Sequence, residues 1–554
     1  MKIFLPIALV TLILTLNAFS AQNEAKAKRK ISSDDLIEQI APSDKKITDE
    51  LNSIILSVKP SVLADGSPNY EQTAKTVKSA IDKIVKLADS NPQSDIAQLY
   101  KAAAEHIPLF KGFVYRLRKV VEVADVAYIS AIWSLKQFKQ TSNFRAPYFE
   151  ALFDLLTMPN PEESILGQKG MFDSVSEFQN WMVNQIAPRF AKTIKSMKAI
   201  AYKSGNGLHP IGLIKADLLV GEIIAKKYEP SKNTHREWIL TSGHLIGAVS
   251  SLENYMGFLY YLSAYDLEKL AEFTNILSQE TFIAVDGAAS RSEIFSKASK
   301  RVDLLSTKRV YELTSPVPGK NKVGLFGKNS LVKNQNEREL YKSFGTIRPI
   351  AKQKVSDYDN YLLAAKSYFT EAAKDQYEFH KAMVASYGMS GEDKLVINPS
   401  SYKATLDITP YIDKDQVLEK SIEILEANGP VTLEDHFIKK SYTINTSVLF
   451  DINKVSDLRN FLPNKFSDSR KERSPEDPAG LNWFSNNVEK WKQNFSWNYS
   501  YNKATQWKDP SFGGLLPNIG SEKQGDELNL HLLNVSSQPE VPYMALWLSM
   551  FYGY

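Results

Sequence analysis

The aromatic residues near the end of the chain are the residues best suited to bind a ligand. Five of the eight tryptophans lie between Trp483 and the last residue. Phe495, Trp497 and Tyr499 alternate with serine and asparagine, so on a β-strand their rings would share one face. Flat rings on one face can stack on a sugar much as they stack on one another. The candidate ligand-binding residues are Trp483, Trp491, Trp497, Tyr499, Tyr501 and Trp507.

A hydrophobic core is the alternative role for the same residues. Buried aromatic side chains dominate the energetics of a core, and we expect Trp497 and its neighbours to be core residues. A glycan hydrolase would also need two carboxylates about 5–10 Å apart. Sequence spacing identifies no such pair, so the catalytic residues are unknown and the sequence favours a protein that is not an enzyme.

The sequence predicts no metal site and no cofactor. Without cysteine there is no thiolate ligand and no cysteine nucleophile. His235 and His244 would face opposite sides of a continuous helix, because nine steps of about 100° separate them, and His244 is expected to be a hydrogen-bonded core residue. Glu434, Asp435 and His436 form a carboxylate–imidazole cluster, but charged triplets mostly face water.

The first residues follow the pattern of a secretory signal peptide. Lys2 is the only charge before an apolar stretch from Ile3 to Leu16, and Ala18 and Ser20 place small residues before Ala21. We expect cleavage after Ser20 and export to the periplasm, the cell surface or the medium. An exported chain without disulfides depends on core packing, which favours a bacterial cell envelope over a small secreted module.

Charge and composition exclude several classes of protein. The formal net charge is only +4 over 554 residues, which argues against nucleic-acid binding. The chain is 43% hydrophobic and 23% charged, as in ordinary globular proteins, so it is neither a disordered tail nor an integral membrane protein. Its length is enough for about two to four domains.

Helical periodicity dominates the sequence as far as about residue 310 and returns near residue 357. Apolar residues recur at steps of three and four in several segments. The predicted helices are 69–89, 113–138, 175–202, 211–227 and 357–387. The segment 113–138 predicts a rod of roughly 40 Å, since each helical residue adds about 1.5 Å. Long, narrow apolar stripes of this kind are typical of helix bundles.

The segment from Trp238 to Tyr265 carries a single formal charge, Glu253. Gly243 and Gly247 give it the small-residue spacing of a membrane helix. It also holds many polar groups, which lipid would leave without hydrogen-bond partners. We therefore predict a helix buried at the centre of a bundle and no transmembrane span in the mature chain.

The character of the sequence changes after a Pro/Gly-rich break near residue 315. The residues from Lys320 to Lys354 are rich in lysine and arginine, which is typical of an exposed linker that trypsin would cut. Beyond Gly391 we expect strands at 402–408 and 442–450 and a helix at 415–427. The sequence thus predicts a mainly α protein, in which a long-helix bundle is followed by a smaller mixed α+β, aromatic-rich C-terminal domain.

Five regions and a function follow from these patterns. The regions are a signal peptide 1–20, a helical bundle 21–314, a basic linker or long loop 315–356, a helix 357–390 and a C-terminal domain 391–554. The favoured function is that of an exported bacterial cell-envelope protein, a non-enzymatic helical scaffold with a C-terminal interaction domain. Its partner would be an envelope protein or glycan. The alternative is a glycan-binding protein or glycan hydrolase that uses the aromatic cluster.

Overall fold

The protein is mainly helical, with small sheets. The computed structural model describes residues 33–117, 120, 147–159, 161, 164–205, 207–215, 237–268, 345–386, 414–435, 440–453, 463–466, 504–507, 511, 514–518 and 520. Of this part, 63% is helical and 9% is strand. The predicted signal peptide, the strand at 402–408 and the aromatic stretch 495–501 lie outside the described residues.

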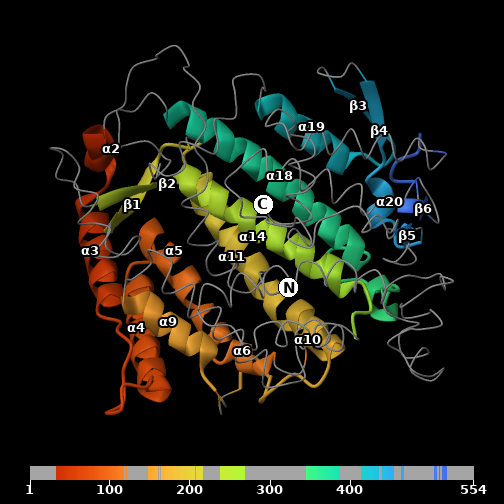
Figure 1. Ribbon diagram of the computed structural model, residues 1–554. Coiled ribbons are helices and arrows are strands. Elements are labelled where there is room, and N and C mark those ends of the chain that lie inside the picture. The colour runs from red at the N-terminus through yellow and green to blue at the C-terminus, as the bar shows by residue number, and fades with distance from the viewer. Residues whose placement is uncertain are drawn as a thin grey trace, which may run out of the picture.

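Short and medium helices form the N-terminal part (Figure 1). They are α2 (Ser33–Gln39), α3 (Pro42–Leu56), α4 (Tyr70–Ser90), α5 (Asp95–Ala104), η1 (Ile107–Phe110), α6 (Phe113–Arg116) and α9 (Pro147–Thr157). Helix α4 confirms the prediction for 69–89. The side chain of Asn69 caps it by accepting from the backbone N–H of Gln72, and Val77, Ile84 and Ala88 are buried on one face.

The predicted rod from 113 to 138 is seen only at its start. Helix α6 ends at Arg116, and residues 121–138 lie outside the described part of the chain. Arg116 is buried, and its guanidinium donates to the carbonyls of Gln168 and Gly170. These hydrogen bonds tie the end of α6 to the loop before α10.

The predicted helix 175–202 is confirmed as one helical segment with a wider turn inside it. It consists of α10 (Val175–Trp181), the π-helical turn η2 (Met182–Ile186) and α11 (Ala187–Ala201). The N–H of Ala187 donates to the carbonyl of Met182, five residues back. Proline lacks an N–H and its ring clashes with the carbonyl of a regular helix, so the wider turn accommodates Pro188 without ending the helix.

The prediction of a helix at 211–227 is wrong for its first residues. Residues Pro210–Lys215 form strand β1, which pairs antiparallel with β2 (Glu237–Thr241). Ile211 and Leu213 alternate on the buried side. A Cβ on Gly212 would lie 2.9 Å from the Ile96 side chain, so glycine allows β1 to pack closely on α5.

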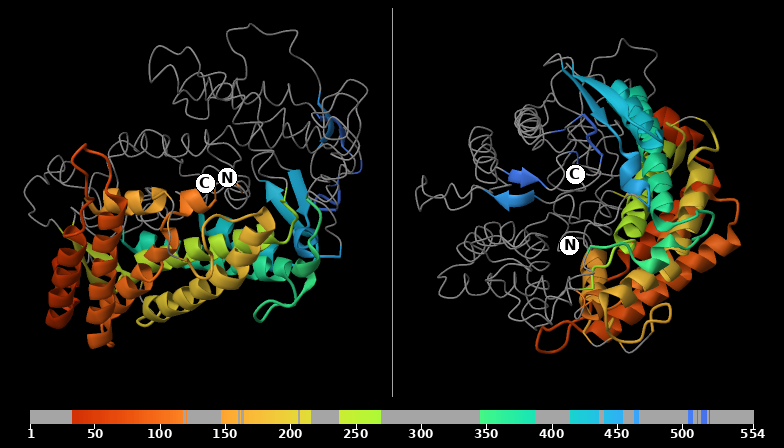
Figure 2. Two further views of the ribbon diagram at one scale, coloured as in Figure 1. Left: turned by 90° about the horizontal axis from the view of Figure 1, so that it is seen from below. Right: turned by 90° about the vertical axis from the view of Figure 1, so that its right-hand side faces the viewer.

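Helix α14 (Ser242–Ser263) is the buried central helix that the sequence predicts, although it begins after strand β2 rather than at Trp238. It lies beside α18 (Tyr361–Ser386), and α11 packs against it from another side (Figures 1 and 2). Two α14 glycines allow this contact, since a Cβ on Gly247 would meet Phe379 at 3.1 Å and one on Gly257 would meet Phe369 at 2.7 Å. No helix in the described part of the chain is long and apolar enough to cross a membrane.

The end of the predicted exposed linker is packed instead. Residues 345–356 include the 3-10 helix η3 (Pro349–Lys352), and Arg348 and Ala351 are buried. Ile347 pairs with Tyr265, and the N–H of Arg348 donates to the carbonyl of Ala264. The predicted exposure is therefore wrong for Arg348 and Ala351, whereas Lys352, Gln353 and Lys354 are exposed as expected. Backbone hydrogen bonds hold the start of this stretch against the end of α14.

Helix α18 confirms the prediction for 357–387, with a later start. The side chain of Asn360 accepts from the N–H of Leu363 and so caps the helix. Tyr361, Ala365 and Phe369 are buried in the hydrophobic cluster that also holds α11 and α14 residues. The helix after the basic segment therefore shares its core with helices from the first half of the chain.

Small elements complete the described chain. They are α19 (Lys414–Glu426), β3 (Val431–Asp435), β4 (Lys440–Ile444), α20 (Ser447–Phe450), β5 (Pro463–Phe466) and β6 (Ala504–Trp507). Helix α19 confirms the prediction for 415–427. The predicted strand 442–450 is correct only to Ile444, because Val448 to Phe450 turn into α20 and pack into the main core.

Candidate functional site

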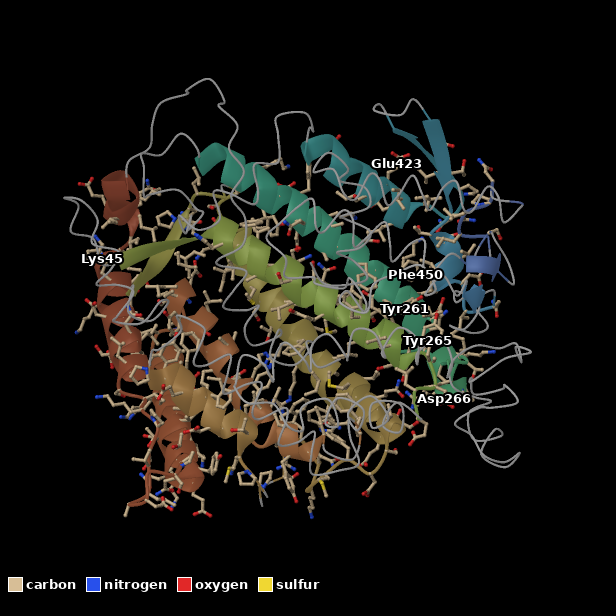
Figure 3. All side chains as sticks on the ribbon, in the orientation of Figure 1. Lys45, Tyr261, Tyr265, Asp266, Glu423 and Phe450 are labelled. Atoms are coloured by element: carbon tan, nitrogen blue, oxygen red, sulfur yellow. The ribbon has the colours of Figure 1, made fainter. Side chains whose placement is uncertain are left out.

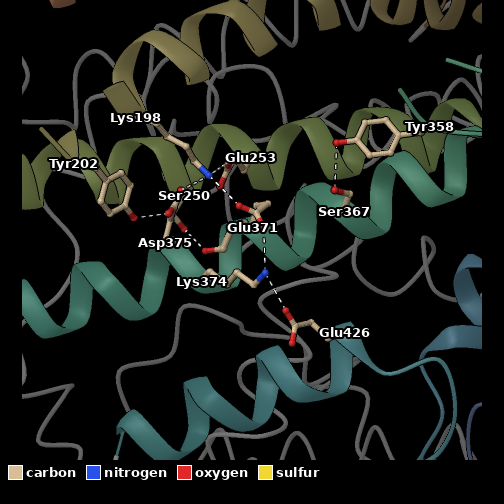
Figure 4. Close-up of polar contacts among 11 residues, drawn as sticks. Lys198, Tyr202, Ser250, Glu253, Tyr358, Ser367, Glu371, Lys374, Asp375 and Glu426 are labelled. Atoms are coloured by element: carbon tan, nitrogen blue, oxygen red, sulfur yellow. Dashed lines mark hydrogen bonds and ion pairs between the residues drawn. The ribbon is translucent and has the colours of Figure 1, made fainter. Parts of the chain in front are cut away.

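A lysine surrounded by three carboxylates lies between α11, α14 and α18. Lys198 extends from α11, and its Nζ lies 2.7 Å from Glu253 Oε1 on α14. The same Nζ lies 3.2 Å from Glu371 Oε2 and 3.1 Å from Asp375 Oδ2, both on α18. Figure 4 shows the four side chains converging from the three helices. One ammonium thus joins three helices that are distant in sequence.

Burial separates the inner carboxylates from the outer one. The side chain of Glu253 is 3% exposed and that of Asp375 is 6% exposed, whereas that of Glu371 is 43% exposed. A buried carboxylate without a partner is strongly unfavourable. Lys198 therefore supplies the positive charge that the buried Asp375 needs and a hydrogen-bond partner for Glu253, while Glu371 can rely on water.

Hydrogen bonds extend the cluster at both ends. The hydroxyl of Tyr202 donates to Asp375 Oδ1 at 2.5 Å, and the hydroxyl of Ser250 donates to the carbonyl of Ala372 at 2.8 Å. On the other side, Lys374 bridges Glu371 at 3.2 Å and Glu426 at 2.9 Å. The second bridge links α19 to α18 (Figure 4), so the polar cluster spans four helices.

The pKa of Glu253 is the most informative electrostatic feature. Burial, followed by the charge of Asp375, raises this pKa to about 9, and Lys198 only partly opposes the shift. Two carboxylates held close together cannot both ionise easily. Glu253 is therefore protonated at neutral pH. Within the described residues its Oε2 atom is buried and has no hydrogen-bond partner.

Lys198 and Tyr202 both keep their protons. Burial acts to lower the pKa of Lys198, but the hydrogen bond and charge of Glu253 and the charge of Asp375 outweigh it, so the pKa is raised. Burial, then the hydrogen bond to Asp375, raises the pKa of Tyr202. The cluster therefore contains an ammonium, a phenol and a neutral carboxyl group around the Asp375 carboxylate.

The arrangement is suited to holding helices together rather than to catalysis. A carboxyl group with a raised pKa can serve as a general acid, but it must reach a substrate. A pocket of about 560 Å³ in the described part of the chain is lined by residues such as Ser176 and Arg348 and by none of the cluster. The Lys198 ammonium occupies the position between the carboxylates where a cation would bind. In the described part of the chain, no group of His, Asp or Glu side chains is arranged to hold a metal ion.

Most of the aromatic candidates are not placed. Trp483, Trp491, Trp497, Tyr499 and Tyr501 lie outside the described residues. Trp507 is the last residue of β6, where its backbone pairs with Pro463 of β5. Of the six, only Trp507 lies in the described part of the chain, and both roles for them remain predictions.

The histidines and carboxylates weighed in the sequence analysis are also placed only in part. His244 lies in the first turn of α14, where its Nδ1 accepts from the N–H of Thr241 at 3.2 Å. It is hydrogen bonded, as expected, but it caps the helix from a half-buried position and is not a core residue. Glu434 and Asp435 lie on β3, opposite Ser441 and Lys440, whereas His235 and His436 lie outside the described part.

The sequence reasoning missed the lysine–carboxylate cluster, although one signal was visible. Glu253 is the only charge in a 28-residue apolar segment, and a lone charge on a buried helix needs a partner. Asp375 lies three residues after Ala372 and four before Phe379, on the apolar stripe of α18. A carboxylate on the buried face of each of two helices indicates that the two share a cation. The sequence does not identify the lysine that supplies it.

Comparison with known proteins adds no relative: no family model, no curated protein and no solved structure matches this chain.

Proposed function

We propose that this chain is an exported bacterial cell-envelope protein that acts as a non-enzymatic helical scaffold. The signal-peptide pattern at residues 1–20 and the absence of cysteine support the compartment. The closed lysine–carboxylate cluster is the observation that carries the scaffold role. Glu253 and Asp375 are almost fully buried, and both contact Lys198. These contacts hold α11, α14 and α18 together.

The C-terminal region supplies the interaction in this proposal. A helical bundle at 21–314 would carry a mixed α+β domain at 391–554, connected through residues 315–356 and the helix at 357–390. The aromatic residues from Trp483 onward would form the core of that domain, and its partner would be an envelope protein or glycan. This assignment rests on the clustering of aromatic residues in the sequence.

The compartment is tested by sequencing the N-terminus of the protein from its native host. A mature chain that begins at Ala21 in an extracytoplasmic fraction is expected. A chain that begins at Met1 and fractionates with the cytoplasm would contradict the proposal.

Substitution of Trp497 separates the scaffold from its glycan-binding alternative. In the full mature chain, Trp497→Ala should cost about 3–5 kcal/mol of unfolding free energy if the ring is a core residue. Trp181→Ala is the matched control, because Trp181 is buried and its Nε1 donates to the carbonyls of Ile165 and Leu166. An unchanged melting temperature for Trp497→Ala, together with lost retention on insoluble polysaccharide, would replace the scaffold by a glycan-binding protein.

A further inference from the structure

A pocket of about 560 Å³ lies where the chain from residue 345 meets the end of α14. The N–H of Asp266 donates to the carbonyl of Thr346 at 2.8 Å, and Ile347 pairs with Tyr265. The segment from Thr346 and the residue Asp266 after α14 form two walls of the pocket, and Ser176 and Asn180 of α10 form the third. Asp266 follows Tyr265 just beyond the end of α14 in Figure 3. A volume of this size is within the usual range for small-molecule sites.

Arg348 gives the pocket a buried positive charge. It is 8% exposed, and its guanidinium donates to the carbonyl of Ser263 at 3.0 Å and to Asn180 Oδ1 at 2.7 Å. Neither acceptor is an ion. Burial lowers the pKa of Arg348, and the carboxylates of Asp266 and Glu268 are near enough for their charges to oppose this shift in part. A guanidinium has five N–H donors in a fixed fork that matches a carboxylate, so donors remain for a ligand.

Asp266 gives the same pocket a negative group. Its Oδ1 accepts from the N–H of Glu268 at 2.9 Å, which leaves Oδ2 without a hydrogen bond among the described residues. The side chain of Glu268 is engaged differently, since its Oε2 accepts from the N–H of Ser176 at 2.9 Å. Asp266 is therefore the carboxylate that lines the pocket and is open to a ligand cation.

The remaining wall is apolar. Ile347, Pro349 and Ile350 line it. The pocket therefore combines the guanidinium of Arg348, the carboxylate of Asp266 and an apolar surface. A simple anion would be repelled by Asp266, and a simple cation by Arg348. A molecule with both charges satisfies both groups.

We propose that this pocket binds a zwitterionic amino acid with an aliphatic side chain. The ligand carboxylate accepts from Arg348 and from the Asn180 amide, its ammonium donates to Asp266, and its side chain packs on Ile347, Pro349 and Ile350. Such paired recognition is specific, because a molecule that lacks either charge leaves a polar group of the pocket without its partner.

The test uses L-leucine as the probe, with two molecules that each carry half of its charge. Calorimetric titration of the full mature chain should detect leucine binding. The probe 4-methylpentanoate lacks the ammonium and 3-methylbutylamine lacks the carboxylate, and each should bind at least about tenfold more weakly, which corresponds to about 1.4 kcal/mol. Absence of leucine binding at about 10 mM, or equal binding of all three, would overturn the proposal.

Substitutions locate the binding. Asp266→Asn keeps an oxygen acceptor for the Glu268 N–H and should weaken leucine binding at least about tenfold while strengthening binding of 4-methylpentanoate. Asp82→Asn is the matched control, since it removes an exposed carboxylate on α4 that does not line the pocket, and it should leave the affinity for leucine unchanged. Arg348→Lys should abolish binding, and Arg116→Lys, at a buried arginine outside the pocket, should not. If Arg348→Lys does not fold, Asp266→Asn decides, and leucine binding that it leaves unchanged contradicts the proposal.

Discussion

The Tyr202 hydroxyl donates to Asp375 Oδ1 at 2.5 Å, across 173 residues of sequence. Tyr202 is 40% exposed, whereas the Asp375 side chain is only 6% exposed. A tyrosine at the surface thus donates a hydrogen bond to a carboxyl group in the interior. This contact marks the edge of the cluster around Lys198, and the following predictions test how that cluster stabilises the fold.

Removal of the central ammonium should be strongly destabilising. Lys198→Met leaves the Asp375 carboxyl group buried without a cation and removes the Nζ partner of Glu253. The expected loss of unfolding free energy is about 3–5 kcal/mol by chemical denaturation. Lys203→Met is the control, because Lys203 pairs with Asp95 at the surface and should contribute at most about 1 kcal/mol. Equal effects of the two substitutions would mean that the cluster does not hold the helices together.

The stability of the protein should fall as the pH rises, because of Glu253. Its pKa is about 9 in the folded protein against an ordinary value of 4.5, so the folded state binds the proton more tightly. The resulting stabilisation is complete below about pH 4.5 and is lost as the pH rises toward 9. Glu253→Gln cannot ionise, so the variant should gain stability relative to the wild type over this range.

Denaturation curves at several pH values measure this difference. Lys198 and Tyr202 also have raised pKa values, to which Glu253 contributes. Their contribution to stability is lost only above their ordinary values near 10, beyond the range in which the two proteins are compared. A constant difference between the wild type and Glu253→Gln from pH 5 to 9 would show that Glu253 titrates normally.

The Tyr202–Asp375 hydrogen bond should contribute measurably even though the ring is partly exposed. Tyr202→Phe removes the donor and should cost about 1–2 kcal/mol, since hydrogen bonds to charged groups are stronger than average. Tyr377→Phe is a matched control, because the Tyr377 hydroxyl donates to Glu419 at 2.7 Å in an exposed position. A double-mutant cycle with Asp375→Asn isolates the pair, and a coupling energy near zero would contradict the assignment.

The two glycines of α14 should differ in their tolerance of a methyl group. Gly257→Ala would place a Cβ 2.7 Å from the ring of Phe369, closer than real contacts allow, and should cost about 1–3 kcal/mol through overpacking. Gly247→Ala would place it 3.1 Å from Phe379, so a smaller loss is expected. Thermal melts compare the two, and an equal or stabilising effect at Gly257 would mean that α14 and α18 are not closely packed.

Helices with their own apolar periodicity were predictable from the sequence. Helices α4 and α19 have clear stripes and local stop signals, and the segment of α14 is too apolar to lie anywhere but in the interior. Strand β1 was not predictable, because a short apolar run fits a helix or a strand equally well until its partner β2 is known.

The candidate site was predictable only in part. The lone charge of Glu253 indicated that some cation must reach α14. Lys198 is one of many lysines on amphipathic helices, and nothing in its own sequence context distinguishes it. Pairing between Lys198, Glu253 and Asp375 depends on how α11, α14 and α18 cross, which is a property of tertiary packing. The pocket at Arg348 depends in the same way on residues 345–350 lying against the end of α14.

The pairing of α14 with α18 also determines the order of folding. The contact between Ser250 and Ala372 closes a loop of 122 residues, and forming such a loop is slow compared with forming a helix. Until α18 arrives, the face of α14 that packs on α18 has no cover. A nascent or partly folded chain therefore exposes this apolar face of α14 for longer than faces that local contacts cover, and a chaperone that binds apolar segments would find a target there.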